Sequence, residues 1–405
     1  MLSEHIKISS ILIACSVSIA LGLASAMAPS TTISEPLPAR TPDNPLASPF
    51  KPASISDACP IIPAAFQTES MATSDDTADD PALWIHPTNP EQSIIITTNK
   101  KQGLVVYNLQ GFLIQSLPIG KPNNVDVLCS IKTPSWSFPT TDLAMTGNRD
   151  GDIINLFTID PSSGILHDAG SFSAGFQEVY GICAYFHPGT ASPRIAINNK
   201  SGTVRIFELL PSHERSFTSA LISEFHVGTQ VEGMVADPAH NSLYIGEEQV
   251  GLWRYRLDPI EDQPQRTLVD LIHNPTSAIS GRLARDVEGV TLYELNDREG
   301  YIIASCQSED RFAIYDRISH AYRGSFRIST QVSSQAQVDA VTHTDGIAAC
   351  SLPVGSRFPH GLFIAQDDNA GQPQNFKIVD WQLIAQGFTP PLRVRIGRNS
   401  TAPLP

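Results

Sequence analysis

The chain has 405 residues and a formal net charge of -14 at pH 7. This acidic balance argues against binding to nucleic acid or to an anionic membrane surface, because both carry dense negative charge. Its 26 glycines and 31 prolines, without a long amphipathic helical stretch, indicate many short strands joined by turns.

The N-terminal segment has the features of an export signal. The polar start MLSEHIK precedes the apolar run ISSILIACSVSIALGLASAMA, which ends in small residues. We therefore expect a signal peptide over residues 1–28, cleaved after Ala26 or Ala28, and an extracellular or periplasmic protein. Two alternatives are a membrane anchor, for which the run is short and interrupted by serines, and a lipoprotein signal ending at Cys15, beyond which the apolar run continues.

A segment without periodicity follows the signal. Residues 29–65 are rich in proline, serine, threonine and alanine, which is typical of a flexible linker. No later segment is long and apolar enough to span a bilayer, so we expect no membrane span.

From residue 66 onward, a strand-type repeat recurs at intervals of 46 to 57 residues. Each repeat opens with a short apolar strand headed by a possible metal ligand: Asp80, Asp126, Tyr180, Glu232, Glu288 and Asp345. A period of this length is typical of a β-propeller with one repeat per blade. We therefore predict an all-β fold over residues 66–393, a six-bladed β-propeller of four-stranded antiparallel blades around a central channel, with a C-terminal tail over 394–405.

A second apolar strand in each repeat ends in a polar pair. The pairs contain Lys100, Arg149 and Lys200 in the first three blades, but Glu248 and Asp367 in later ones. Because antiparallel neighbours reverse direction, both polar sets should surround the same channel mouth, basic on one half and acidic on the other.

Ordinary turn chemistry is an alternative explanation of these pairs, because Asn-Lys and Asn-Arg are common in turns. Turns do not require carboxylates at the head of a buried strand, however. Converging carboxylates need cations, and hard oxygen ligands favour calcium, whereas lysine and arginine bind phosphate oxygens. The pattern therefore predicts a polyanionic ligand bridged by calcium.

Other catalytic signatures are missing from the sequence. The five cysteines after the signal are too widely spaced for a zinc ribbon, and no GxSxG, HExxH or P-loop motif occurs. A serine or zinc hydrolase is therefore disfavoured. Disulfide pairing stays open.

The string DDTADDPALWIHPTNPEQSIIITTNKKQGLVVYNLQG, followed by GKPNNVDV, resembles the bacterial β-propeller (alkaline) phytases. The resemblance continues through EVYGICAY, VEGMVAD, SLYIGEE, VEGVTLY, THTDGI and GLFIAQDDN, over roughly residues 70 to 385. It implies a six-bladed phytase of the 3-phytase type that hydrolyses calcium-phytate, with several calcium ions at the mouth and two adjacent phosphate sites. We expect it to act as a monomer.

The resemblance also assigns roles to single residues. It implies metal ligands at Asp79, Asp80, Tyr180, Glu232, Glu248, Asp286, Glu288, Asp339, Asp345 and Asn369. It implies phosphate binding by Lys100, Lys101, Arg149 and Lys200. The match at Asn369 is loose, because this chain reads QDDN and is one residue shorter there.

The expected chemistry needs no side-chain nucleophile. Calcium ions together with Lys100 and Arg149 would neutralise the phosphate charge, so that a calcium-bound water can attack phosphorus directly. Glu232 or Glu288 would take the proton of this water. Calcium acidifies water less than zinc does, so we expect activity near neutral to alkaline pH.

Two other classes of function remain open. Calcium-dependent propeller lactonases and general phosphatases also place carboxylates in the channel, but Lys100, Arg149 and Lys200 disfavour a lactonase with one catalytic calcium. A non-enzymatic binding propeller would need no converging carboxylates.

Overall fold

The computed structural model describes residues 59–72, 75–132, 140–212, 216–258, 265–332 and 337–396. These residues all belong to one compact unit, Ser54–Pro405. The predicted signal peptide, the linker up to residue 58 and the tail from residue 397 lie outside the described residues.

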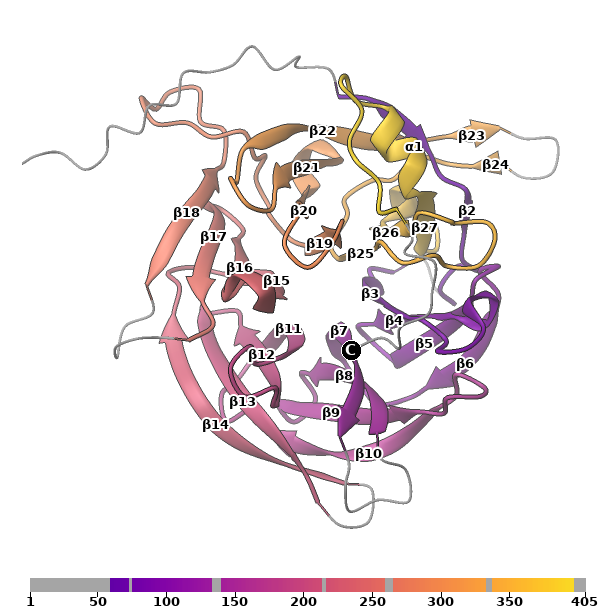
Figure 1. Cartoon of the computed structure of the whole chain (residues 1–405), viewed down its shortest axis with the longest axis vertical. Coiled ribbons are helices and arrows are strands. Elements are labelled where there is room, and N and C mark those ends of the chain that lie inside the picture. Colours follow the sequence, from indigo (N-terminus) through magenta and orange to yellow (C-terminus); the bar gives the residue numbers. More distant parts are fainter. Residues whose placement is uncertain are drawn as a thin grey trace, which may run out of the picture. The chain divides into compact units, whose positions relative to one another are not determined.

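Six sheets are arranged as blades around a central axis (Figure 1), which confirms the predicted six-bladed β-propeller. The first blade comprises β3 (Ala78–Trp84), β4 (Ile94–Asn99), β5 (Gly103–Asn108) and β6 (Leu113–Leu117). The second comprises β7 (Pro122–Lys132), β8 (Thr140–Asn148), β9 (Ile153–Ile159) and β10 (Leu166–Ser173). The third comprises β11 (Val179–Phe186), β12 (Pro193–Asn199), β13 (Thr203–Pro211) and β14 (Phe217–His226). The fourth blade comprises β15 (Val231–Asp237), β16 (Ser242–Glu247), β17 (Gly251–Arg256) and β18 (Arg266–Leu271). The fifth comprises β19 (Val290–Glu294), β20 (Gly300–Cys306), β21 (Arg311–Asp316) and β22 (Tyr322–Ser329). The sixth comprises β25 (Ile347–Cys350), β26 (Leu362–Asp367), β27 (Asn375–Asp380) and β2 (Phe66–Gln67).

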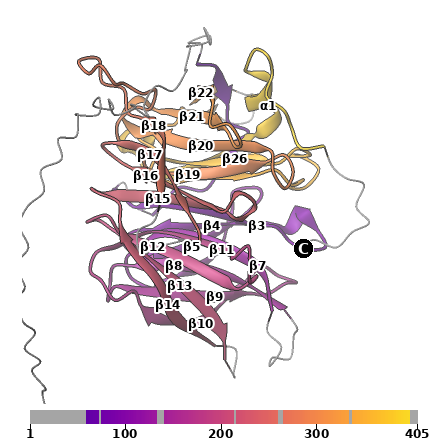
Figure 2. The same cartoon turned by 60° about the vertical axis from the view of Figure 1, so that its left-hand side comes forward.

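The first strand of each blade lies innermost. Each inner strand contacts the inner strands of the two neighbouring blades, so β3, β7, β11, β15, β19 and β25 form a closed ring. Figure 2 shows several of them side by side after a 60° turn. All six inner strands begin at the same end of the channel, and we call this end the mouth.

The core lies between adjacent blades. Trp84, Ile94 and Ile96 of the first blade pack against Val125 and Phe157 of the second in one apolar cluster. Because both faces of a blade are covered by its neighbours, the second strands are almost continuously buried, as in IIITTN of β4.

The N-terminal residues close the ring. β2 pairs antiparallel with β27 as the outer strand of the sixth blade. β1 (Ile61–Pro63) pairs parallel with β22 and adds a fifth strand to the fifth blade. β1 falls within residues 29–65, for which we predicted a linker, so ordered sheet structure begins before residue 66.

The remaining elements are short. They are the hairpin β23 (Gln331–Val332) and β24 (Gln337–Val338), helix α1 (Trp381–Gln386), and the 3-10 helices η1 (Pro90–Gln92), η3 (Pro238–His240), η4 (Gln307–Glu309) and η5 (Asn369–Gly371). None of the helices in the described ranges has the length and apolar character needed to cross a bilayer.

Candidate active site at the channel mouth

A register shift near the start of the inner strand recurs in the first four blades. The shifts fall between Ala78 and Pro81, Pro122 and Val125, Val179 and Ile182, and Val231 and Met234. Such an irregularity re-aims the side chains that it contains. The equivalent mouth positions are therefore Asp79, Asn123, Tyr180 and Glu232.

This register corrects the alignment made from the sequence. Asp80 lies one residue, and Asp126 three residues, beyond the position equivalent to Glu232. Their carboxylates instead join adjacent blades. Val125 N donates to Asp80 Oδ2 at 3.0 Å, and Ala184 N donates to Asp126 Oδ2 at 2.7 Å.

Glycines allow the inner strands to approach closely at the mouth. Gly233 N donates to the carbonyl oxygen of Glu288 at 2.8 Å, and a Cβ added at Gly233 would lie only 1.9 Å from that oxygen. The Glu-Gly pair therefore places a carboxylate at the mouth while it permits contact with the next blade.

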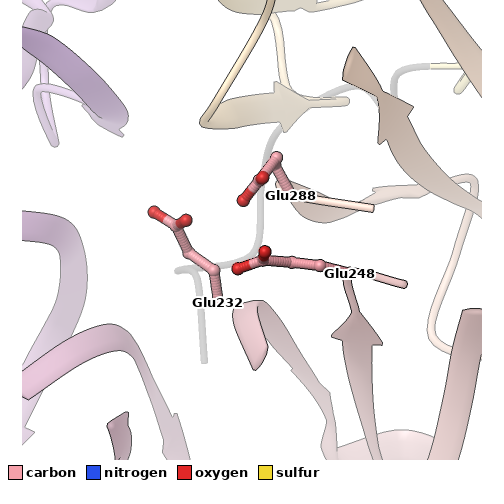
Figure 3. A group of neighbouring side chains, drawn as sticks. All are labelled: Glu232, Glu248 and Glu288. Atoms are coloured by element: carbon pink, nitrogen blue, oxygen red, sulfur yellow. The ribbon is translucent and has the colours of Figure 1, made fainter. Parts of the chain in front are cut away.

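Three buried glutamates form the centre of the acidic half. Glu232, Glu248 and Glu288 each offer a carboxylate oxygen within 4.8 Å of the others (Figure 3). Their exposed fractions are 2%, 7% and 7%. Figure 3 shows the carboxylates of Glu248 and Glu288 pointing toward the same space, with the Glu232 carboxylate at its edge.

Burial and mutual repulsion disfavour ionisation of this triad. Burial, and then the charge of Asp79, raise the pKa of Glu232 to about 7. Burial and the charge of Glu232 raise the pKa of Glu288 well above its ordinary value. Burial also raises the pKa of Glu248. A bound cation would reverse these shifts by stabilising the ionised forms.

The oxygens at the mouth fit such a cation. Among the described residues, Glu248 Oε1, Glu288 Oε2 and Asp79 Oδ2 are buried without a hydrogen-bond partner. A buried carboxylate oxygen without a partner is costly, and a divalent ion would satisfy several at once. This donor set of carboxylates alone suits a hard cation such as calcium.

Tyr180 lies between the acidic and basic halves of the mouth. Burial and the nearby charge of Glu232 raise the pKa of its phenol. The Lys200 ammonium lies over the Tyr180 ring, 4.8 Å from its centroid. The tyrosine thus connects a phosphate-binding candidate with the glutamate triad.

Lys100 is held by three carboxylates. Its Nζ lies 2.8 Å from Asp76 Oδ1, 3.0 Å from Asp79 Oδ1 and 2.9 Å from Asp345 Oδ2. Burial opposes the charge of Lys100, but these carboxylates outweigh it and raise the lysine pKa. Lys100 therefore stays cationic at the boundary between the two halves.

The other basic residues are less tightly held. Arg149 Nη2 donates to the carbonyl oxygen of Lys100 at 3.2 Å, while the buried Arg149 Nε has no partner among the described residues. Lys101 is half-exposed and lies 3.5 Å from Asp75. The structure thus brings Lys100 and Arg149 together, with Lys101 at the edge.

Asp345 and Asp286 lie beside this centre. Gln307 Nε2 donates to Asp345 Oδ1 at 2.5 Å, and burial raises the pKa of Asp345. Asp286 N donates to the carbonyl oxygen of Glu248 at 3.0 Å. The side-chain amide of Gln249 donates to the carboxylate of Asp286.

Asp339 and Asn369 are engaged elsewhere. The buried ammonium of Lys377 lies 2.8 Å from Asp339 Oδ1 and 2.5 Å from Asp367 Oδ2. Asn369 Nδ2 donates to the carbonyl oxygen of Pro373 at 2.7 Å. A lysine thus supplies the cation at the place where the resemblance implied calcium ligands. All the metal-ligand assignments, including those of Asp80, Asp339 and Asn369, stay predictions.

Several residues at the site were missed by the sequence reasoning. Asn123 Nδ2 donates to Glu232 Oε1 at 2.7 Å. The only sequence signals for Asn123 and Asp76 were their positions in NNVDV and DDTADD, and nothing in the repeat pointed to Lys377.

The inner strands also enclose a cavity of about 650 Å³ behind the mouth, lined in part by Asp80 and Asp126. This cavity is the central channel that the propeller prediction implied.

Comparison with known proteins identifies the family. The phytase family model matches residues 47–396. A 3-phytase of Bacillus subtilis (strain 168) is 34% identical over 341 residues, which cover 80% of this chain and 85% of that protein.

Two solved structures are more distant. An auxiliary nutrient binding protein from Bacteroides thetaiotaomicron is 10% identical with a TM-score of 0.45, over 79% of this chain and 75% of that one. A functionally unknown protein from Desulfotomaculum acetoxidans is 15% identical with a TM-score of 0.40, over 60% and 70%. These likenesses are too weak to bear on function. The family match and the Bacillus relative, by contrast, show that the chain belongs to the phytase family.

Proposed function

We propose that this phytase is calcium dependent and of the 3-phytase type, and that it hydrolyses myo-inositol hexakisphosphate as its calcium complex at the channel mouth. Family membership makes the chain a phosphatase-type hydrolase with a small-molecule substrate. The observation that carries the proposal is the buried triad of Glu232, Glu248 and Glu288 beside the cations Lys100 and Arg149.

The triad, together with Asp79, would hold the metal. When bound, calcium would neutralise phosphate charge and lower the pKa of a coordinated water. The unpartnered oxygens of Glu248, Glu288 and Asp79 support this assignment. Calcium is the choice because it accepts several carboxylates in flexible geometry.

The basic half would bind and orient the substrate. Lys100 and Arg149 carry fixed positive charge next to each other and would hold the oxygens of the reacting phosphate. Lys200, which lies over Tyr180, would contact a neighbouring phosphate. A ligand with adjacent phosphates can then occupy both positions at once.

Proton transfer falls to the glutamates. In the reaction the water oxygen bonds to phosphorus and its proton passes to a glutamate, the ester P–O bond breaks, and the leaving inositol oxygen takes up a proton from solvent. Glu232, whose pKa is raised to about 7, is suited to accept the proton of the water near neutral pH. Its neighbour Glu288 is the alternative acceptor.

We also propose that the protein is exported and acts as a monomer. The composition of residues 1–28 supports export. A monomer is sufficient because one mouth contains all the residues that the reaction uses.

Substrate preference tests the proposal. A simple monoester fills only the reacting position and forgoes the binding energy of the second phosphate. We expect kcat/KM for calcium-phytate to exceed that for p-nitrophenyl phosphate by about 100-fold or more, if the second phosphate contributes about 3 kcal/mol. Equal values would indicate a general phosphatase.

A further inference from the structure

A cationic cavity, separate from the central channel, lies in the fifth blade. It has a volume of about 370 Å³, and its lining includes Arg282, Arg311, Arg327, His273, Glu309 and Cys59. We call it the rim pocket. Three arginines face one glutamate there, although the whole chain carries a net charge of -14.

The three guanidinium groups are held in place. Arg327 Nε and Nη2 both donate to the carbonyl oxygen of Glu309 at 3.1 Å. Arg311 Nε pairs with Glu309 Oε2 at 2.6 Å, and its Nη2 donates to the carbonyl oxygen of Arg282 at 2.7 Å. The Arg282 guanidinium lies over the Tyr322 ring, 5.0 Å from its centroid.

These contacts leave donors free. Within the described part of the chain, Nη1 of Arg311, Nη1 of Arg327 and the Arg282 guanidinium have no hydrogen-bond acceptor. Only Glu309 offers a compensating carboxylate in the lining, and Arg311 already occupies it. Preorganised guanidinium groups with free N–H donors match the geometry of a phosphate group.

The rim pocket is on the same side of the blade as the mouth. Helix η4 contributes Gln307 to Asp345 at the mouth and Glu309 to the rim pocket. Ser308 Oγ of the same helix donates to the carbonyl oxygen of Arg285, in the segment that leads from Arg282 to Glu288.

We propose that the rim pocket is a second anion site that binds a phosphate group, either free or carried on an inositol phosphate. The site goes beyond the proposed function, because none of its lining residues belongs to the catalytic mouth. It needs no calcium, since arginines supply its charge. It would hold released phosphate or a substrate molecule next to the mouth.

Cys59 offers a local measurement, because it lines the rim pocket. The alkylation rate of Cys59 by iodoacetamide would be followed by mass spectrometry on the full chain in chelator. Inorganic phosphate and inositol hexakisphosphate serve as separate probes. We expect alkylation to slow about tenfold at a probe concentration of about ten times the dissociation constant, because only the free fraction reacts.

Matched variants assign the effect. R282Q/R327Q should abolish the protection, whereas R323Q, which changes an exposed arginine of the same strand β22 outside the rim pocket, should retain it. If the double variant does not fold, the single variants R282Q and R327Q should each weaken the protection of Cys59. Protection by inositol hexakisphosphate alone would show that the rim pocket binds an ester phosphate. Protection by both probes would show that it binds free phosphate as well.

The proposal is overturned if neither probe slows alkylation in the parent chain, or if the arginine variants are protected as well as the parent. The assay contains no calcium and measures no turnover, so its outcome is separate from that of the phytate test.

Discussion

Glu232 and Glu288 lie buried side by side, so that ionisation of one carboxyl opposes ionisation of the other. A carboxyl whose pKa is raised in the folded state contributes stability below its unfolded pKa, and that stability is lost as pH rises through the folded pKa. For Glu232 this interval runs from about 4.5 to about 7. Burial raises the pKa of Asp126 to about 6, which acts in the same direction.

The metal-free protein should therefore lose thermal stability between pH 5 and pH 8, while the stabilisation by calcium should increase over the same range. Differential scanning fluorimetry in chelator and in calcium measures both. E288Q should reduce the slope, because it removes one of the two repelling carboxyls. A metal-free melting temperature that rises over this interval would contradict the assignment.

Lys377 is a second residue on which stability should depend, because its buried ammonium pairs with both Asp339 and the fully buried Asp367. K377M should lower the free energy of unfolding by about 3–5 kcal/mol, since it leaves a buried carboxylate without a counter-ion. Chemical denaturation should show the same loss in chelator and in calcium.

K121M is the matched control, because Lys121 is exposed and its single ion pair among the described residues is with an exposed Asp150. If calcium restores the stability of K377M but does not affect the control, Asp339 binds calcium, as the family resemblance implied, together with Asp367.

At the scale of elements, the N-terminal strands close the propeller by pairing with strands far along the chain. Ile62 of β1 is buried in the cluster that contains Ile328 and Ile384, whereas its neighbour Ile61 is 66% exposed. I62A should cost about 2–5 kcal/mol of unfolding free energy by leaving a cavity. I61A on the same strand should change it by about 0.5 kcal/mol or less.

Equal effects of the two substitutions in chemical denaturation would show that β1 does not pack as described. Ring closure would then rest on β2 alone.

The blades could be predicted because each repeats a local apolar pattern of fixed period. The register at the mouth could not, because a β-irregularity adds residues without changing the apolar alternation. For this reason the repeat pointed to Asp80 and Asp126, whereas Asp79, which only the family resemblance named, and Asn123 occupy the positions equivalent to Glu232. Strand β1 was missed because three residues in a proline-rich segment carry no periodic signal.

The candidate site was predictable to a similar degree. Glu232 and Glu288 stand at the heads of inner strands and Glu248 follows the end of β16, positions that the repeat marks, and the structure brings them together. Asp76 pairs with Lys100, and Lys377 pairs with Asp339, between neighbouring segments of a single blade. No local apolar pattern marks such side-chain contacts.

At the scale of the whole molecule, the propeller brings the starts of six inner strands to one mouth. There, Glu248, Glu288 and Asp79 each keep a buried carboxylate oxygen without a hydrogen-bond partner among the described residues. The glycines beside them permit close contact of the inner strands, which holds the backbone positions of these residues near one another. A cation at the mouth therefore links catalysis to the stability of the fold.

Phosphate release from inositol hexakisphosphate, with and without calcium, tests this account most directly. Exhaustive chelation should abolish turnover and calcium should restore it, and E248Q should need more calcium than D150N, which changes an exposed acid on the same face. Undiminished turnover in chelator would contradict a calcium-dependent mouth.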